Sequence, residues 1–566
     1  MKAFHTTAGI SLSALLLGLG LAACGGGSDS LRTESTVLNQ PTALESSERT
    51  VSKKESGFLT SAPAQAAALP GSELDLLPLL TVGDEVPLLT GSWPDLETDP
   101  SRTYGVAGIP DGLGWVQARG YNWVWVNHEM SAGNLSDFSS TVSGQINGAR
   151  VSIFKFNSDW ECLGGMNLIN TIVDESGVIG GISLDGNTVS QSGHVFSRFC
   201  SGNLSTLFDH GQPVWLPGEE TGGGRGWAIY RDGTALSIDD AQRCARENNW
   251  AMRSFRNETV LVGTDDSTNR PLVLYVGDRS HTDRDGFRSG SSWVLNIEDA
   301  AGNFISNTGE MLTGETYRAS WALIPAEYYT NTAAYYAWTD AAPWRGTDFV
   351  RLEDGEEDPD QDGDFYFFTT GSNGTHDVYG ALFRLEFNER RPTGSGRITR
   401  LAEGGPGSFI SPDNLTISGG YIYGQEDVNG GAPLNQMIAE QRNGSVWRMD
   451  KDGGNQLRVI TQDQTPYDGF NTAGELAANG ISIWETSGII EVGGCRGGSG
   501  LLFTVQAHSL NDPADMGGGN YVQGGQILLA TGRPSSGHGH GKGHGNGHGH
   551  GHSGHGNGHG NGHGGH

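Results

Sequence analysis

Basic residues are scarce in this chain of 566 residues. Lysine and arginine together number 35, against 65 aspartates and glutamates, which gives a formal net charge of −30. A protein of that charge repels the phosphate backbone of nucleic acids, so we expect no nucleic-acid partner. It also repels phosphate esters unless bound cations reverse the local field. The charge therefore favours either a protein that carries metal ions or a function that involves no phosphate.

Cysteine is rare as well, with five in total. Cys24 stands near the N-terminus, and the other four are Cys162, Cys200, Cys244 and Cys495. Four cysteines in a domain of this size do not make a disulfide framework, even in an export compartment that permits bridges. One bridge that leaves free thiols and two bridges both stay open.

Several common catalytic signatures are missing. The chain has no G-x-S-x-G elbow, no H-E-x-x-H and no C-x-x-C pair. The glycine-rich segment Gly222–Gly226 lacks the Lys-Ser/Thr that follows in a phosphate-binding P-loop. The sequence therefore does not support a serine hydrolase, a zinc protease or a nucleotide-dependent enzyme.

The apolar stretch at the N-terminus, Ile10–Leu21, follows Lys2 and is too short to anchor the chain by spanning a bilayer. It ends in Leu-Ala-Ala-Cys at Cys24, which is typical of a bacterial lipoprotein signal peptide over residues 1–23. An ordinary secretory signal with an accidental cysteine is the alternative. We expect an exported protein that acyl chains on Cys24 hold at the membrane. Because Gly25 rather than Asp follows Cys24, we expect the lipoprotein to be sorted to the outer membrane or cell surface, with the periplasm as the other possible location.

The lipid anchor can be tested by replacing Cys24 with alanine. The Cys24→Ala chain should no longer incorporate labelled palmitate in bacterial cells, because the thiol that carries the lipid is gone. Labelling equal to that of the wild type would exclude Cys24 as the lipidated residue.

Helical periodicity is scarce, and short β-type runs separated by Gly, Asn, Asp and Ser predominate. The clearest runs are Trp123–Val126, Val151–Phe156, Thr259–Val262, Leu272–Val276, Phe365–Thr369, Leu382–Phe387, Tyr421–Gly424, Ser445–Met449 and Gly500–Val505. A spacing of roughly ten residues with turn signals between the runs predicts an all-β fold. The predicted domain, residues 86–533, is too long for one sandwich. A β-propeller with loop and short helical insertions accommodates it and gathers inner strands around an axis.

Three segments interrupt this pattern. Asp239–Phe255 is predicted to be an inserted helix, and the Ser-, Thr-, Ala- and Pro-rich residues 24–85 are predicted to form a flexible tether. Residues 534–566 alternate glycine with ten of the 17 histidines and should be disordered. That tail could buffer metal ions or be a dispensable low-complexity sequence, and its deletion should abolish neither folding nor activity.

Short acidic signatures are spread along the domain and mostly touch an apolar run. They are Asn127–Glu129, Phe199–Leu204, Gly218–Glu220, Gly263–Asp266, Arg351–Gly355, Pro412–Asn414 and Gln425–Asp427. Carboxylates at the ends of many separate strands are what a central site for several hard cations requires. Taken singly, each has a plainer interpretation: a solvated strand end for Glu129, a buried structural thiol for Cys200, and a hydrated acidic turn for Glu219-Glu220.

A separate acidic loop resembles the start of a calcium-binding loop. Asp358, Asp360, Asp362 and Asp364 alternate along the chain, with Gly363 after the third. Thr369 stands where an EF-hand would have its final glutamate, so this is not an EF-hand. The alternatives are a peripheral structural calcium site and a solvated acidic loop.

Read in order, these segments resemble the PhoX-type alkaline phosphatase family, from about Gly105 to Leu529. The resemblance rests on the signatures above together with D-G-L-G-W at Asp111–Trp115, G-A-R-V-S at Gly148–Ser152, W-E-T-S-G-I-I-E-V at Trp484–Val492, V-Q-A-H-S at Val505–Ser509 and G-G-Q-I-L-L at Gly524–Leu529. It implies a six-bladed propeller whose axial iron and calcium ions hydrolyse phosphomonoesters.

The resemblance also implies roles for individual residues. Arg351 would bind the phosphate and Glu353 would act with it in catalysis. The implied metal ligands are Glu129, Cys200, Glu219, Glu220, Asp265, Asp266, Glu353, Asp354, Asp413, Glu426 and Asp427.

The chain departs from the family pattern at two places. The family's T-P-W-G-T stretch is missing between Cys200 and Glu219, and Ser267 stands where the family has a third acid. One metal ligand could therefore be lost, or supplied by Asp265, Asp266 or Glu258.

The sequence and its family resemblance predict a metal-dependent phosphomonoesterase whose substrate is a small phosphate ester. We expect a monomer that is attached to the membrane through its lipid alone. Two alternatives stay open. One is a hydrolase of another ester, such as a phosphodiester, phytate or a lactone. The other is a non-catalytic lipoprotein that captures a metal or another ligand.

Overall fold

The structure is a computed structural model, and it describes residues 55–427, 430–467, 484–495, 498–510 and 518–532. These residues are mostly β-strand, which confirms the all-β prediction. The described part also holds two α-helices, α1 (Thr332–Asp340) and α2 (Ala432–Glu440). Neither these nor any other described helix has the length and apolar character needed to cross a membrane. Cys24, the signal peptide and the histidine-rich tail lie outside the described residues.

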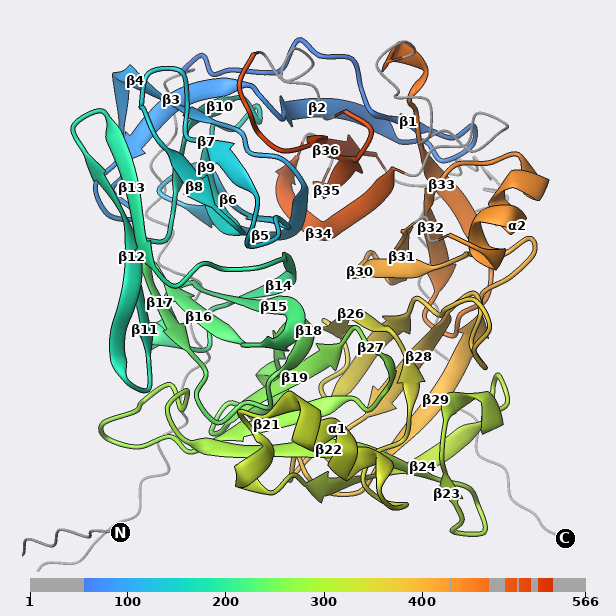
Figure 1. Cartoon of the computed structure of the whole chain (residues 1–566). Coiled ribbons are helices and arrows are strands. Elements are labelled where there is room, and N and C mark those ends of the chain that lie inside the picture. The colour runs from blue at the N-terminus through green and yellow to red at the C-terminus, as the bar shows by residue number, and fades with distance from the viewer. Residues whose placement is uncertain (1–54, 428–429, 468–483, 496–497, 511–517, 533–566) are drawn as a thin grey trace, which may run out of the picture. The chain divides into compact units, whose positions relative to one another are not determined.

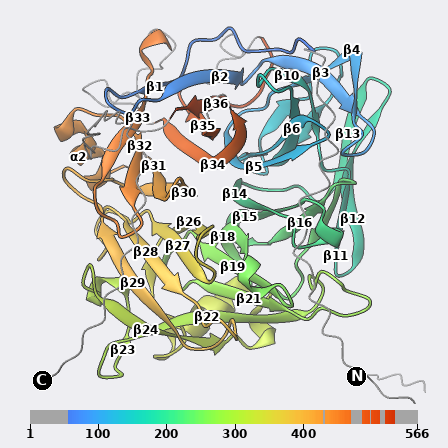
Figure 2. The same ribbon diagram turned by 180° about the vertical axis from the view of Figure 1, so that it is seen from behind.

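Six strands, which we call the inner strands, lie around a common centre (Figure 1). They are β5 (Pro110–Ala118), β14 (Phe199–Ser205), β18 (Cys244–Ala251), β26 (Leu352–Glu357), β30 (Pro412–Ser418) and β34 (Glu485–Cys495). Each contacts the next in this order, and β34 contacts β5. The view from behind shows the same arrangement (Figure 2).

Further strands extend outwards from each inner strand, mostly antiparallel to their neighbours; β10 with β3 and β11 with β17 are parallel pairs. Behind β5 lie β6 (Tyr121–His128), β9 (Arg150–Phe156), β10 (Cys162–Asn167), β3 (Glu85–Thr90) and β4 (Glu97–Gly105). Behind β14 lie β15 (Val214–Gly224), β16 (Trp227–Tyr230), β17 (Thr234–Ser237), β11 (Thr171–Asp174), β12 (Gly177–Asp185) and β13 (Thr188–Gly193). Behind β18 lie β19 (Thr259–Asp265), β21 (Val273–Gly277), β22 (Gly290–Glu298), β23 (Phe304–Ile305) and β24 (Thr316–Leu323).

The remaining three groups complete the arrangement. Behind β26 lie β27 (Asp364–Thr369), β28 (Ala381–Glu386) and β29 (Gly396–Glu403). Behind β30 lie β31 (Tyr421–Glu426), β32 (Ser445–Asp450), β33 (Leu457–Gln462) and β1 (Ala66–Ala68). Behind β34 lie β35 (Gly498–Ala507), β36 (Gly524–Thr531) and β2 (Asp75–Thr81). Two short pairs stand apart: β7 (Leu135–Asp137) with β8 (Gln145–Asn147), and β20 (Thr268–Arg270) with β25 (Phe349–Val350).

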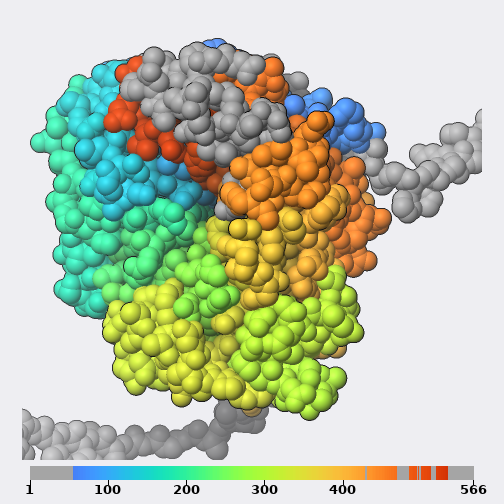
Figure 3. All heavy atoms as spheres, turned by 45° about the vertical axis from the view of Figure 1, so that its right-hand side comes forward, coloured from blue at the N-terminus to red at the C-terminus, as the bar shows by residue number. Residues whose placement is uncertain are grey.

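The predicted strands are confirmed in position. Each of the nine apolar runs overlaps an observed strand, and several of the strands extend two or three residues beyond the predicted run, as β6, β19 and β35 do. The groups of strands follow one another in chain order around the common centre. The order of colours in the space-filling view agrees with this (Figure 3).

The predicted tether over residues 24–85 extends too far along the chain. Two strands lie within it: Ala66 of β1 pairs with Gln462 of β33, and Asp75 of β2 pairs with Thr531 of β36. Both strands therefore complete sheets whose other members come from the last third of the chain. A local composition rich in Ser, Ala and Pro gives no sign of such long-range partners.

The predicted helix over Asp239–Phe255 is wrong. Its central part is the inner strand β18, which pairs with β15 on one side and β19 on the other. Only Arg253–Phe255 form a short 3-10 turn. Hydrogen bonding to strands on both sides overrides the weak local preference of this segment for helix.

The apolar core lies between neighbouring groups of strands, not at their common centre. Trp123 and Trp125 of β6 share a buried cluster with Trp215 of β15 and Trp227 of β16. The described cysteines are all free thiols, so both open disulfide schemes are wrong.

Candidate metal centre

Four of the inner strands begin with the same backbone turn. Ile109, Arg198, Arg351 and Ser411 have φ between 49° and 58°, the left-handed region. The carbonyl of each accepts a hydrogen bond of 2.9 Å from the backbone amide of a residue in the same group: Glu129, Glu220, Thr370 or Asp427. Three of these donors come directly after the second strand of their group, and Glu220 lies within β15. In the group of β18, Ala245 accepts a similar bond from Asp266 at 2.8 Å. Non-glycine residues in this region are strained, and such strain is often found at functional sites.

This repeated turn sets which side chains face the centre. Two positions after each turn residue stands Asp111, Cys200, Glu247, Glu353 or Asp413, at the start of its inner strand. The residues whose amides donate to the turns lie close to the same strand starts. Three groups of potential ligand atoms lie within 4.8 Å of one another: Asp111 with Glu129 and Cys200, Cys200 with Glu220 and Glu247, and Glu247 with Glu353 and Asp413. We call these residues the acidic centre. Cys200 and Glu247 each belong to two groups, so the three groups are continuous.

A glycine allows the first two groups to meet. A Cβ atom on Gly112 of β5 would lie 2.5 Å from the carbonyl oxygen of Cys200. Any larger residue would therefore push β14 away from β5 and separate Cys200 from Asp111. This explains the Asp-Gly dipeptide at the start of β5 in physical terms.

The acidic centre concentrates negative charge in a buried place. Burial, and then the charge of Asp266, raise the pKa of Glu353 well above its ordinary range. Burial and then Asp266 also raise the pKa of Glu247 to about 7. The Cys200 thiol has a pKa well above its ordinary range because of burial and then the charge of Glu129. These groups would hold protons unless cations compensate them.

Two arginines reach the acidic centre from the strained turns. The Arg351 guanidinium binds Asp266 through two bonds of 2.7 and 3.1 Å, and its Nη2 lies 3.3 Å from Glu353 Oε1. The Arg198 guanidinium is paired with the Glu220 carboxylate, and its Nε donates to the Glu220 carbonyl at 2.9 Å. Both arginine side chains are partly exposed.

The donor set fits metal ions. Asp111 Oδ1 is buried without a hydrogen-bond partner in the described part of the chain, while its Oδ2 accepts from Gln506 at 3.0 Å. Buried carboxylates are normally either hydrogen-bonded or bound to cations. The buried acidic clusters could therefore hold metal ions, and a thiolate with carboxylates suits a transition metal beside harder cations.

The structure brings seven of the eleven predicted ligands together, and the side chains of the other four point away from the acidic centre. Glu129, Cys200, Glu220, Glu353 and Asp413 belong to the acidic centre, and Asp266 and Asp427 reach it through Arg351, with Asp427 Oδ2 3.9 Å from Nη1. The four that point elsewhere are Glu219, Asp265, Asp354 and Glu426. Three of these directly precede a residue that faces the centre, and successive side chains of a strand point to opposite faces.

Each of the four has its own partners. Glu219 accepts from Trp227 Nε1 at 3.0 Å, and Asp265 accepts from the Tyr336 hydroxyl at 3.1 Å. Glu426 binds Arg442 at 2.6 Å, and Asp354 accepts from the backbone of Gly355 and from Asn248. These bonds show structural roles for the four carboxylates. Of the proposed substitutes for the family's third acid, Glu258 is exposed, and Asp266 is the one at the centre.

Three residues of the centre or its edge were not predicted from the sequence: Asp111, Glu247 and Glu485. Glu247 lay in the segment expected to be helical, and Asp111 stood in a glycine-rich segment with a single acid. Glu485, the first residue of β34, forms a side-chain hydrogen bond with Asp413. A repeated order along the chain could have identified them: an acid or a thiol at the start of one strand, followed by an acid in or just after the next strand.

The predicted calcium loop lies apart from the acidic centre. Asp358 is buried and accepts from Lys451 Nζ at 2.7 Å, and Asp360 accepts from the same ammonium at 3.1 Å. Asp362 is exposed, 3.7 Å from Arg253 Nε, and Asp364 begins β27. Lys451 already supplies positive charge to two of the four acids. A calcium ion at this loop stays a prediction.

The raised pKa values predict how the metal-free protein responds to pH. An acid whose pKa is higher in the folded than in the unfolded chain binds more protons when folded, so stability falls as pH rises between the two values. For Glu247, with a folded pKa of about 7, the loss is roughly 3 kcal/mol. We therefore expect the melting temperature of chelator-stripped protein to fall between about pH 4.5 and pH 7, and much less so with metal bound. A flat profile for the stripped protein would contradict the buried acidic centre.

A solved structure supports the fold. No protein-family model matches this chain, and no curated protein sequence matches it. The solved structure of Pseudomonas fluorescens PhoX in complex with vanadate, a transition-state analogue, matches with a TM-score of 0.55 and 13% identity, over 85% of this chain and 98% of that one. An α-L-arabinofuranosidase from Clostridium thermocellum matches with a TM-score of 0.25 and 8% identity, over 62% of this chain and 94% of that one. The chain has a PhoX-like fold.

Proposed function

We propose that this chain, built on a PhoX-like fold, is a metal-dependent phosphomonoester hydrolase whose acidic centre lies on the axis of a six-bladed β-propeller. The observation that carries the proposal is the excess of buried acid around Cys200. Asp111, Glu220, Glu247, Glu353 and Asp413 are all buried, and two arginines face them. Two arginines cannot neutralise five buried carboxylates, and burial of the remaining negative charge is costly, which supports the binding of cations at this centre.

The donor types indicate which residues would hold which ions. Cys200, with Glu220 and Glu247, offers a thiolate beside carboxylates, which suits iron. Glu247, Glu353 and Asp413 offer oxygen alone, which suits calcium. Bound cations would stabilise charge on the phosphoryl oxygens and lower the pKa of a bound water or hydroxyl group.

The chain's own residues would orient the ester. Arg351 presents a planar, partly exposed guanidinium that can bind two phosphate oxygens, as it now binds the two oxygens of Asp266. Asp266 would hold this arginine in place before the substrate arrives. Arg198 occupies the matching turn of the group of β14 and can contact a further oxygen of the same phosphate.

The N-terminal sequence extends the proposal to location. A signal peptide that ends at Cys24 supports an exported lipoprotein at the outer membrane or cell surface, acting as a monomer on small phosphate esters. This part rests on sequence alone.

The test is phosphate release from p-nitrophenyl phosphate by the purified full chain, before and after a chelator, with elemental analysis of the same sample. Iron and calcium together with chelator-sensitive turnover would support the proposal. Metal without turnover on this or other phosphomonoesters would exclude the phosphatase and leave a binding protein or a hydrolase of another ester. A protein purified without metal, and unable to take it up, would exclude the metal centre.

A further inference from the structure

A cavity lies among the inner strands, beyond the acidic centre. It has a volume of about 210 Å³, and all six inner strands contribute to its wall. None of the residues of the three ligand groups lines it. Its lining residues come later in the same strands, such as Leu113 after Asp111 and Thr416 after Asp413. Glu491 and Pro359, both exposed, mark its opening to solvent.

A layer of hydrogen bonds separates this cavity from the acidic centre. Asn414 Nδ2 donates to Ser201 Oγ at 2.6 Å, and Asn414 Oδ1 accepts from Ser487 Oγ at 3.0 Å and from the Gly488 amide at 2.8 Å. Ser201 in turn donates its backbone amide to Glu247 of the acidic centre at 3.0 Å. The cavity is therefore a separate space, and the proposed chemistry at the metal ions does not use it.

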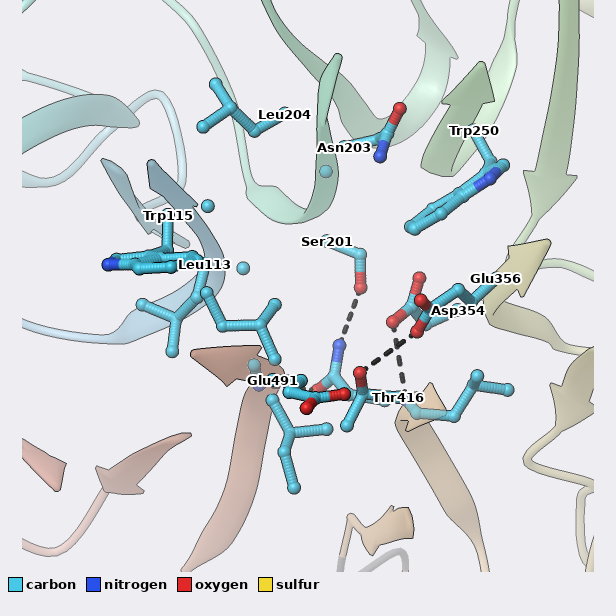
Figure 4. Close-up of a pocket in the computed structure, with 18 of the residues that line it drawn as sticks. Leu113, Trp115, Ser201, Asn203, Leu204, Trp250, Asp354, Glu356, Thr416 and Glu491 are labelled. Carbon is cyan, nitrogen blue, oxygen red and sulfur yellow. Dashed lines mark hydrogen bonds between the residues drawn. The ribbon is translucent and has the colours of Figure 1, made fainter. Parts of the chain in front are cut away.

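Two tryptophans form apolar walls of the cavity. Figure 4 shows Trp115 of β5 and Trp250 of β18 extending towards the hollow from different sides, each with its indole nitrogen turned away. The nitrogen of Trp115 donates to Asn122 at 3.2 Å, outside the cavity. The surface that both residues offer to the cavity is therefore the apolar part of the ring.

The polar groups of the cavity include an acceptor and a donor that are both unused. Glu356 Oε2 accepts from Thr416 Oγ1 and from the Ile417 amide, both at 2.9 Å, whereas Oε1 has no bond within the described residues. Asn203 is only 9% exposed, and its Oδ1 accepts from the Ala251 amide at 3.2 Å. Its Nδ2 has no partner in the part of the chain that the structure describes, and Figure 4 shows this nitrogen turned towards the hollow.

This combination is selective for one class of ligand. An unpaired amide donor that is nine-tenths buried calls for an acceptor, which a simple cation does not offer. The Glu356 and Glu491 carboxylates disfavour an anion. Burial raises the pKa of Glu356 to about 7, although the hydrogen bonds from Ile417 and Thr416 act in the opposite direction. Near neutral pH the carboxyl group can therefore either accept or donate a hydrogen bond. A ring that carries hydroxyl groups at its edge and C–H groups on its faces satisfies both the polar groups and the indoles.

We propose that this cavity binds one pyranose unit of a neutral carbohydrate, with a face of the ring against Trp250 and its hydroxyl groups bonded to Glu356, Asn203 and, at the opening, Glu491. The volume is below that of pockets for drug-sized ligands, which limits the occupant to about one ring. The site is independent of the proposed phosphatase activity, because no ligand of the acidic centre takes part in it.

The first experiment is saturation-transfer NMR on the full chain with methyl pyranosides of glucose, galactose, mannose and xylose, followed by calorimetric titration of those that respond. We expect at least one pyranoside to show saturation transfer and saturable binding. Removal of metal by a chelator that leaves the fold intact should leave this binding in place. If none of the four binds, or if a tetraalkylammonium ion binds instead, the carbohydrate proposal is wrong.

Variants decide whether the binding occurs in this cavity. Trp250→Ala removes an aromatic wall, and Glu491→Gln changes an exposed residue whose replacement does not threaten folding. Each should weaken binding by about tenfold. Trp344→Ala, at an exposed tryptophan outside the cavity, is the matched control and should bind as the wild type does. Equal affinity in Trp250→Ala, Glu491→Gln and the control would place the carbohydrate elsewhere and overturn the proposal.

Discussion

Replacement of Glu353 by glutamine is expected to remove bound metal and phosphate release together. Glu353 shares its ligand group with Glu247 and Asp413, and its neighbours Arg351 and Thr370 hold it in position. Glutamine keeps the size of the side chain and can still accept from Thr370, so the fold should survive. It lacks the charge that a cation requires, and its amide hydrogens would point at other potential ligands. We expect turnover to fall by about a hundredfold or more.

The measurement is metal content by elemental analysis and phosphate release on the same sample. Asp354→Asn is the matched control, because it changes the adjacent carboxylate of the same strand. Asp354 belongs to none of the three ligand groups and is held by Gly355 and Asn248. The control should lose stability but keep its metal. Wild-type turnover in a metal-free Glu353→Gln protein would refute the proposed site.

The second large effect is expected from the neighbours Glu219 and Glu220. Glu220 Oε2 accepts from the Cys200 thiol at 2.8 Å and belongs to a ligand group, whereas Glu219 faces Trp227 on the other side of the strand. Glu220→Gln should therefore lose most of its metal and its activity. Glu219→Gln should retain both, because the glutamine oxygen can still accept from Trp227 Nε1.

Metal content, turnover and thermal unfolding of the two variants provide the comparison. Circular dichroism would confirm that both are folded. Equal loss of metal in both variants would mean that both carboxylates face the cations. The outward direction of Glu219, towards Trp227, would then be wrong.

Local patterns predicted the strands well because each depends on short-range alternation and on turn residues. Runs such as Val151–Phe156 and Phe365–Thr369 carry apolar residues suited to a buried strand, and Gly, Asn and Asp separate them. The same reasoning failed at Asp239–Phe255 and at the start of the domain. At the start of the domain the deciding partner is distant in the chain, as Ala66 is from Gln462. At Asp239–Phe255 the partners β15 and β19 are near in the chain, but the local composition does not show that β18 pairs with both of them.

The acidic centre was predicted in kind but only partly in membership. Acids at many strand ends, with Cys200 among them, indicated a central metal site, and the structure gathers most of them. The sequence could not tell which member of a pair such as Asp265-Asp266 or Glu426-Asp427 faces inward. That choice depends on the register between two strands, and a shift of one residue reverses it.

By itself, the sequence determined the all-β class, the positions of most strands and the richness in acid that suits a site for cations. Only the tertiary structure decided that Asp111 and Glu247 join Cys200, that Glu219, Asp265, Asp354 and Glu426 serve the fold, and that a separate cavity with two tryptophans lies beyond the centre. The reason is physical: strand formation depends on neighbours in the chain, whereas a site on a common axis depends on which face each of six separate strands turns towards it.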